Sequence, residues 1–82
     1  MSKKISNGTV HTLTKDIKDV LENTSRLTET WEDITPLARN EWICWITSAK
    51  KSETRNRRIK IMNENLLQGK RRPCCWAGCP HR

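Results

Sequence analysis

Phenylalanine and tyrosine are absent from this sequence of 82 residues, and its only aromatic residues are four tryptophans. Tryptophan must therefore supply the bulky side chains of any core. Hydrophobic residues make up 34% of the chain and charged residues 30%. This composition leaves enough apolar material for one small helical domain and excludes a second domain.

Long apolar runs are also missing. No stretch approaches the roughly 18 apolar residues of a membrane span. The opening MSKKISNGTVHTLTKD has basic residues but lacks the apolar stretch of a signal peptide. We therefore expect a cytoplasmic protein, in which cysteines stay reduced and bind metal or remain thiols more readily than they form stable disulfides.

The groupings that usually carry out catalysis cannot be assembled from this chain. It offers no Ser/His/Asp arrangement, no carboxylate pair and no glycine-rich loop for phosphate. A Cys-His pair at Cys79 and His81 would sit near the end of the sequence with nothing to hold its geometry. We therefore expect a protein that is not an enzyme.

The spacing of apolar residues predicts an all-α fold, a small bundle of about four helices over residues 14–69. Alternation of apolar and polar residues never persists long enough for a strand. We expect residues 1–13 to be a disordered lead-in and residues 70–82 to be a basic tail rich in cysteine and histidine.

Residues that favour helix ends divide the central part of the chain. Thr14 and Ser25 are the expected N-caps of two short helices. Thr35 followed by Pro36 gives the clearest helix start, because proline at the first helical position loses no hydrogen bond. A third helix over residues 36–49 should be the central and most buried element, followed after a short turn by an antiparallel helix from Ser52 to Gly69. The apolar stripe of this last helix is narrow and consists of Ile59, Met62 and Leu66.

Arg55 lies on the same line as that apolar stripe, where a guanidinium is costly unless a carboxylate meets it. Glu41 falls inside the apolar arc of the third helix, between Leu37 and Trp45. The sequence therefore predicts a structural ion pair between Glu41 and Arg55, with a polar ligand site as the alternative.

A recognisable motif runs through the third and fourth helices. It consists of Trp45-Ile46, Ala49-Lys50, Thr54-Arg55 and Arg58, within a similar segment over residues 31–70. It resembles the helical module of the YdeI/OmpD-associated family, also called bacteriocin-protection proteins, in a short form with a basic, cysteine-rich ending. The resemblance implies an all-helical fold, an unknown protein partner and a link to tolerance of antimicrobial peptides or envelope stress, without a catalytic mechanism. Longer relatives have an additional N-terminal domain that this chain lacks.

Positive charge is concentrated in the C-terminal part of the chain. The net charge of the whole sequence is +7, and residues 50–82 hold ten basic residues against two acidic ones. Such a patch attracts nucleic acid through its phosphates without reading sequence. The alternative function is therefore a nucleic-acid-binding module, whose candidate contacts are Arg57, Lys60, Lys70, Arg71 and Arg72, with Trp76 as a stacking residue.

The tail RPCCWAGCPHR gathers most of the cysteines. Cys74, Cys75, Cys79 and His81 could supply four ligands to one zinc ion, and Cys44 could reach over as a distant ligand. The neighbouring ligands would have to converge from a very short stretch of chain. A tail of reduced thiols and a disulfide between Cys74 and Cys79 are the two other interpretations.

Overall fold

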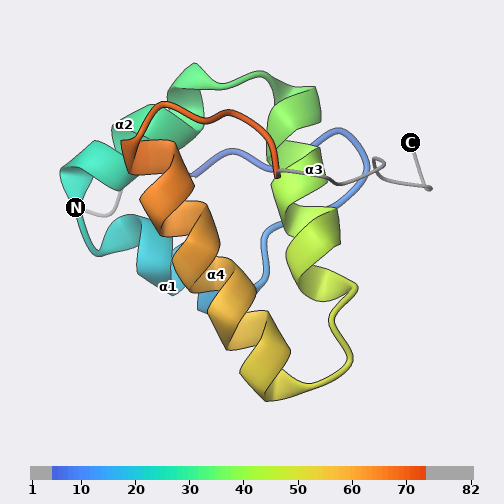
Figure 1. The fold of residues 1–82 in the computed structure, drawn as a ribbon. Coiled ribbons are helices and arrows are strands. Elements are labelled where there is room, and N and C mark those ends of the chain that lie inside the picture. Colours follow the sequence, from blue (N-terminus) through green and yellow to red (C-terminus); the bar gives the residue numbers. More distant parts are fainter. Residues whose placement is uncertain (1–4, 74–82) are drawn as a thin grey trace.

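The computed structural model describes residues 5–73, and within that range the chain forms four helices and no strand. The prediction of an all-α fold is confirmed. The helices are α1 (Lys15–Glu22), α2 (Ser25–Asp33), α3 (Pro36–Thr47) and α4 (Ser52–Leu67). In Figure 1, α3 descends to the turn that joins it to α4, and α4 runs back up from this turn, with α1 behind α4.

The helix starts follow the capping residues closely. At α3 the Thr35 hydroxyl accepts the N–H of Ala38 at 3.1 Å and Pro36 is the first helical residue, as predicted. The cap of α2 is Thr24, one residue before the predicted Ser25, because the Thr24 hydroxyl accepts the N–H of Leu27 at 3.2 Å. Each of these contacts satisfies an N–H group that has no partner within its helix.

The helix ends come two residues earlier than predicted. Helix α3 ends at Thr47 and α4 at Leu67. Beyond α4, Gly69 has a φ of 85° and the N–H of Lys70 bonds to the carbonyl of Asn65 at 2.8 Å. This left-handed glycine with its backward hydrogen bond ends the helix and reverses the chain.

The core lies where the four helices meet and is built around two tryptophans. Trp31 and Trp42 are fully buried, and α3 contributes more buried residues than any other helix, as predicted. The central position belongs to α4, however, because α4 packs against each of the other three helices. The buried residues of α4 are the predicted stripe of Ile59, Met62 and Leu66. No helix in the described part of the chain is long and apolar enough to cross a membrane.

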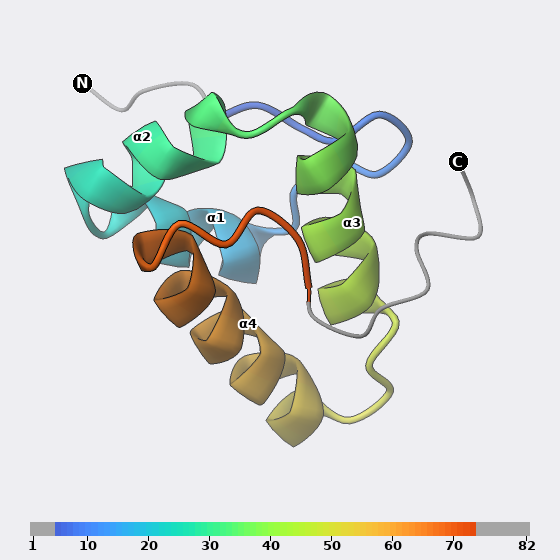
Figure 2. The same cartoon turned by 45° about the horizontal axis from the view of Figure 1, so that its top comes forward.

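The segment before α1 packs against the helices. Residues 5–13 run past the end of α2, turn beside α3 and return to α1 (Figures 1 and 2). Ile5 is buried, and Ser6 and Asn7 bond to side chains of α2 and α3. The prediction of a disordered lead-in is therefore wrong for residues 5–13, because polar side chains of α2 and α3 bind the main chain of this segment.

The segment after α4 also returns to the core. Residues 68–73 cross from the end of α4 to α3 (Figure 2). There the indole N–H of Trp42 donates to the carbonyl of Arg71 at 2.9 Å, and Pro73 is buried. The start of the predicted tail is thus fixed to α3.

Candidate functional site

Arg55 joins α4 to the start of α1. Its Nε bonds to Oδ2 of Asp16, and its other contacts are 3.0 Å from Nη2 to Oδ1 of Asp16 and 2.9 Å to the Thr14 hydroxyl. The Arg55 guanidinium holds the pKa of Asp16 well below its usual range, and Asp16 in turn raises the pKa of Arg55. This is a charge-assisted, two-pronged contact between residues far apart in the sequence.

The predicted ion pair between Glu41 and Arg55 is therefore wrong in its partner. Glu41 is buried on α3, as its place in the apolar arc indicated, at 2% exposure. Arg55 lies in the first turn of α4, close to the turn that joins α4 to α3, whereas Glu41 lies in the first half of α3 and hence far from that turn. The guanidinium reaches sideways to α1, where Asp16 is nearer than a residue of the neighbouring antiparallel helix.

Arg58, one turn after Arg55 on α4, binds the end of α3. Its guanidinium lies over the Trp45 ring, with 5.2 Å from Cζ to the ring centroid, which is the geometry of a cation–π contact. It also donates to the Trp45 carbonyl and to the Ser48 hydroxyl. A cation is favourable here, because the last carbonyls of a helix carry partial negative charge.

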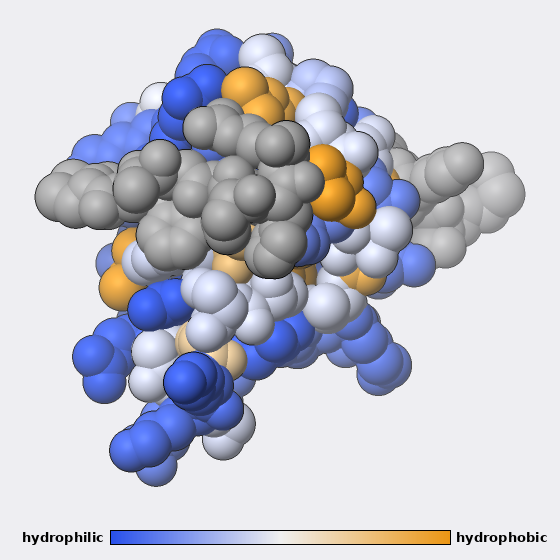
Figure 3. Space-filling view, turned by 90° about the vertical axis from the view of Figure 1, so that its right-hand side faces the viewer, coloured by the Kyte–Doolittle hydropathy of each residue, from blue (hydrophilic) through white to orange (hydrophobic). Residues whose placement is uncertain are grey.

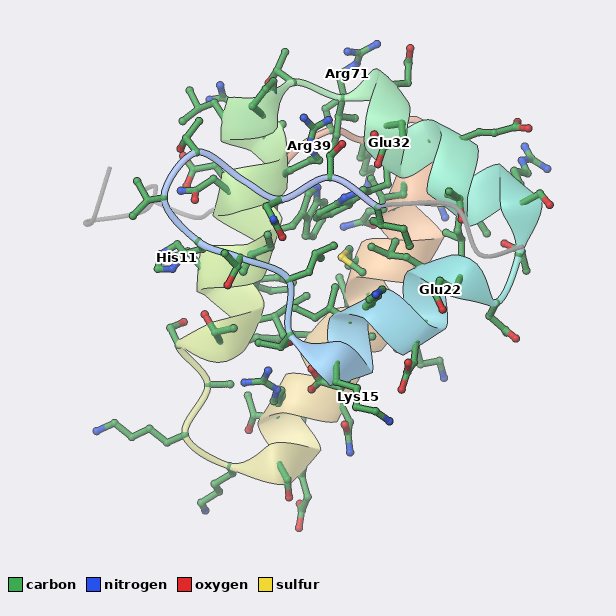
Figure 4. All side chains as sticks on the ribbon, turned by 180° about the vertical axis from the view of Figure 1, so that it is seen from behind. His11, Lys15, Glu22, Glu32, Arg39 and Arg71 are labelled. Carbon is green, nitrogen blue, oxygen red and sulfur yellow. The ribbon has the colours of Figure 1, made fainter. Side chains whose placement is uncertain are left out.

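Arg39 binds the last carbonyls of α2 from a buried position, a role that was not predicted from the sequence. It is only 8% exposed, and its Nη1 donates to the carbonyls of Ile34 at 2.7 Å and Trp31 at 3.3 Å. Its Nε donates to the carbonyl of Asn7 at 3.1 Å. This guanidinium therefore satisfies the carbonyl end of α2 and binds the N-terminal segment at once. Figure 4 shows Arg39 and Glu32 beside that segment where it passes between the two helices.

The exposed charges are unevenly distributed over the surface. The start of α4 and the turn before it expose four cations and one carboxylate, Glu53, whereas α1 and α2 expose five carboxylates and three cations, Lys15, Lys18 and Arg26. Figure 3 shows hydrophilic side chains projecting at the lower end of the molecule, where the turn between α3 and α4 lies. The exposed cations here are Lys50, Lys51, Arg57 and Lys60, and the exposed carboxylates of α1 and α2 are Asp19, Glu22, Glu29, Glu32 and Asp33.

Comparison with known proteins gives one match. Residues 11–69 match the family described as "Bacteriocin-protection, YdeI or OmpD-Associated". The chain belongs to this family. No curated protein and no solved structure matches it.

The motif that resembles the bacteriocin-protection family falls on the contacts described above. Ile46 is fully buried, Trp45 stacks under Arg58, and Arg55 holds Asp16. Together these side chains tie α4 to the end of α3 and to the start of α1. In this family member the motif is thus a structural element that fixes how three helices meet.

The five predicted phosphate contacts that the structure describes are all exposed, but they do not form one patch. Arg57 and Lys60 lie one turn apart in the first half of α4, whereas Lys70, Arg71 and Arg72 follow its end. From Arg57 to Leu67, where α4 ends, ten residue steps correspond to about 15 Å of helix axis. Arg71 also contacts Asp33, with 3.5 Å between Nη2 and Oδ2.

The predicted zinc ligands Cys74, Cys75, Cys79 and His81, and the predicted stacking residue Trp76, lie outside the described residues. Cys44 lies within them and is buried in α3 at 2% exposure. Among residues 5–73, no three side chains of His, Cys, Asp or Glu gather closely enough to hold a metal ion. The metal prediction concerns the tail and remains a prediction.

Proposed function

We propose that this protein is a non-enzymatic, cytoplasmic interaction protein that contributes to tolerance of bacteriocins and other antimicrobial peptides or to resistance to envelope stress. The family description supports the biological role. The contacts of the motif side chains support a function in interaction. Arg55, Arg58 and Trp45 hold helices together and so serve the structure. The function is then left to residues on the exposed surface.

The basic end of α4 is the proposed contact with a protein partner. Lys50, Lys51, Arg57 and Lys60 are exposed there beside a single exposed carboxylate, Glu53, and a surface with an excess of positive charge attracts an acidic partner and speeds its encounter. On α1 and α2 the five exposed carboxylates outnumber the three exposed cations. This negative excess favours a protein partner over nucleic acid, since it repels phosphates that extend beyond the basic end.

A charge-reversal experiment tests this function. Cells that make the wild-type protein should survive a bacteriocin challenge better than cells that lack it, and the double variant Arg57→Glu with Lys60→Glu should lose the protection. The control is Lys15→Glu with Lys18→Glu, which changes the net charge by the same amount on α1 and should keep it. Equal protection by both variants, or equal loss at unchanged protein level, would contradict the proposed surface.

Nucleic-acid binding is the second candidate function, and the exposure of Arg57, Lys60 and residues 70–72 favours it. If all five cations contact phosphates, affinity for duplex DNA should fall about 500-fold between 50 and 200 mM salt. If only the two cations of α4 do so, the fall should be about 10-fold. Fluorescence anisotropy with two unrelated duplexes measures both the salt slope and the expected lack of sequence preference.

Zinc binding by the tail is a separate prediction with its own test. The protein is purified under reducing conditions and its metal content is measured. About one zinc per chain is expected if Cys74, Cys75, Cys79 and His81 act together, and Cys79→Ser with His81→Ala should remove it. A chain without metal, with all its thiols reactive, would support the interpretation as free thiols.

A further inference from the structure

The N-terminal segment is held mainly through its main chain, by side chains of the helices. The indole N–H of Trp31 donates to the carbonyl of Ser6 at 2.8 Å, and Nε of Arg39 donates to the carbonyl of Asn7 at 3.1 Å. Oδ1 of Asn40 accepts two further main-chain groups, the N–H of Val10 at 3.0 Å and that of His11 at 2.8 Å. Contacts of this kind recognise a peptide backbone with little regard to its side chains.

The two sides of this contact differ in burial. Trp31 and Asn40 are fully buried and Arg39 is 8% exposed, so the helices present a fixed set of donors and acceptors. The segment itself fully buries one large apolar side chain, Ile5, and packs a second, Leu13, partly against the core, whereas Val10 is 50% exposed. A short segment with so little apolar burial separates from a protein at a lower free energy than the core unfolds.

Gly8 is the position where the segment fits most tightly. A Cβ atom built on Gly8 would lie 2.5 Å from the Cα of Asn40, which is part of the α3 backbone and cannot move aside. Any larger residue at this position would push the segment off α3. The surface therefore requires a glycine three positions after the buried isoleucine and places little restriction on the other side chains of the segment.

One group of the surface stays unpaired when the segment is in place. Nδ2 of Asn40 is buried without a hydrogen-bond partner, and a buried donor without an acceptor costs free energy. The chain's own segment is therefore an imperfect ligand. A peptide that brings an oxygen acceptor to this position would gain a hydrogen bond that residues 5–13 do not make.

We propose that Trp31, Glu32, Arg39 and Asn40 form a peptide-binding surface that residues 5–11 occupy in the resting protein. Its external ligand is a short peptide with an aliphatic residue, a glycine three positions later, and main-chain groups free to bond. Glu32 completes the surface by accepting the N–H and the hydroxyl of Ser6 at 2.8 and 2.6 Å. The tethered segment has an effective concentration in the millimolar range, so an external peptide binds once the segment is displaced.

The test uses the full chain with Gly8→Val, which displaces the segment, and a fluorescent peptide of residues 5–13. Anisotropy should show saturable binding to the variant and at least about tenfold weaker binding to the wild type, where the tethered segment competes. The same peptide carrying Gly8→Val should not bind. Thr9→Val, at the exposed neighbouring position, is the matched control and should behave as the wild type.

Each other result overturns the proposal. Equal binding to variant and wild type would place the peptide elsewhere, and no binding to a variant with unchanged helical circular dichroism would show that the surface accepts no external ligand. Loss of helical signal in Gly8→Val would show that the segment is part of the core.

A measurement on the wild-type protein gives an independent decision. The amides of Val10 and His11 should exchange hydrogen at least about tenfold faster than that of Ile43 in α3, because the segment opens without unfolding the helices. Equal exchange rates would mean that the segment separates from the helices only on global unfolding, which would overturn the proposal.

A wild-type dimer that dissociates when peptide 5–13 is added would identify the segment of a second copy as a ligand and so support the peptide-binding surface.

Discussion

The helical core and the N-terminal segment are stabilised in opposite ways. The core is a contact between apolar side chains around Trp31 and Trp42, in which each residue loses its accessible surface. The segment, residues 5–13, is held by single hydrogen bonds to its main chain, with Ile5 as its buried apolar anchor. Apolar burial adds up over many contacts and makes unfolding cooperative, whereas separate hydrogen bonds can be exchanged for water one after another.

The largest effect is expected from the core. Trp42→Ala removes a fully buried indole and leaves the Arg71 carbonyl without its donor. We expect it to lower the free energy of unfolding by about 3–5 kcal/mol, a large part of what a small domain has. Urea unfolding followed by circular dichroism measures this. Val10→Ala is the control, because Val10 lies in the segment and is half exposed, and it should change the free energy of unfolding by less than about 0.5 kcal/mol. Similar losses at both positions would contradict the difference between the core and the segment.

The contact between Arg55 and Asp16 tests whether polar contacts between helices behave like the core or like the segment. At neutral pH, Asp16→Asn should lower the free energy of unfolding by about 1–2 kcal/mol. The loss is limited because the side chains of Arg55 and Asp16 are partly exposed, at 25% and 38% respectively. Asp19→Asn, in the exposed pair with Lys15, is the control and should cost less than about 0.5 kcal/mol.

The pH dependence of the same variant gives a sharper test. The pKa of Asp16 is lower in the folded protein than in the unfolded chain, so its contribution is fully present above pH of about 4 and is lost as the pH falls toward the folded pKa. Wild type and Asp16→Asn should therefore differ most at neutral pH and converge on acidification. Parallel stability profiles from neutral to acidic pH would show that Arg55 does not depend on the charge of Asp16.

A smaller effect is expected where the segment meets α2. Glu32→Ala removes both hydrogen bonds that Ser6 donates and leaves the one that its carbonyl accepts from Trp31. We expect it to weaken local attachment of the segment by about 1 kcal/mol while global stability changes by less than half of that. NMR chemical shifts of residues 5–13 should move toward unstructured values while those of α3 stay unchanged. Glu29→Ala on the same helix is the control; shifts that change throughout the core would mean that segment and core act as one unit.

The smallest effect is expected at the outer face of α1. The Lys15 and Asp19 side chains are 91% and 58% exposed, with 3.5 Å between Nζ and Oδ2. Lys15→Ala should change the melting temperature by less than about 2 °C, since an exposed pair contributes at most a few tenths of a kcal/mol. A larger shift would show that α1 is less firmly packed than its buried Ile17 and Leu21 indicate.

The features that were predicted correctly depend on residues that are close together in the sequence. Thr35 with Pro36, and Gly69, define helix ends through contacts within a few residues, and the buried stripe of α4 follows from helical spacing alone. Arg55 was correctly singled out as a charge that needs a partner.

Partners far along the chain were beyond the sequence. Helical periodicity gives the direction of Arg55 on its own helix but not which of three neighbouring helices meets it, and Asp16 lies 39 residues away. The role of Asn40 could not be predicted for a related reason. An asparagine on a helix gives no sign that a segment 30 residues earlier will bond to it. The apolar residues of 5–13 are Ile5, Val10 and Leu13, whose spacing indicates neither a helix nor a strand.

The position of α3 has a consequence for the order in which the chain folds. Val10 bonds to Asn40 across 30 residues, and Trp42 bonds to Arg71 across 29. Closing each of these loops costs chain entropy before any contact compensates for it, and both receiving side chains are in place only once α3 is helical and packed. We therefore expect the two ends of the described chain to dock late, after α3 has formed and packed.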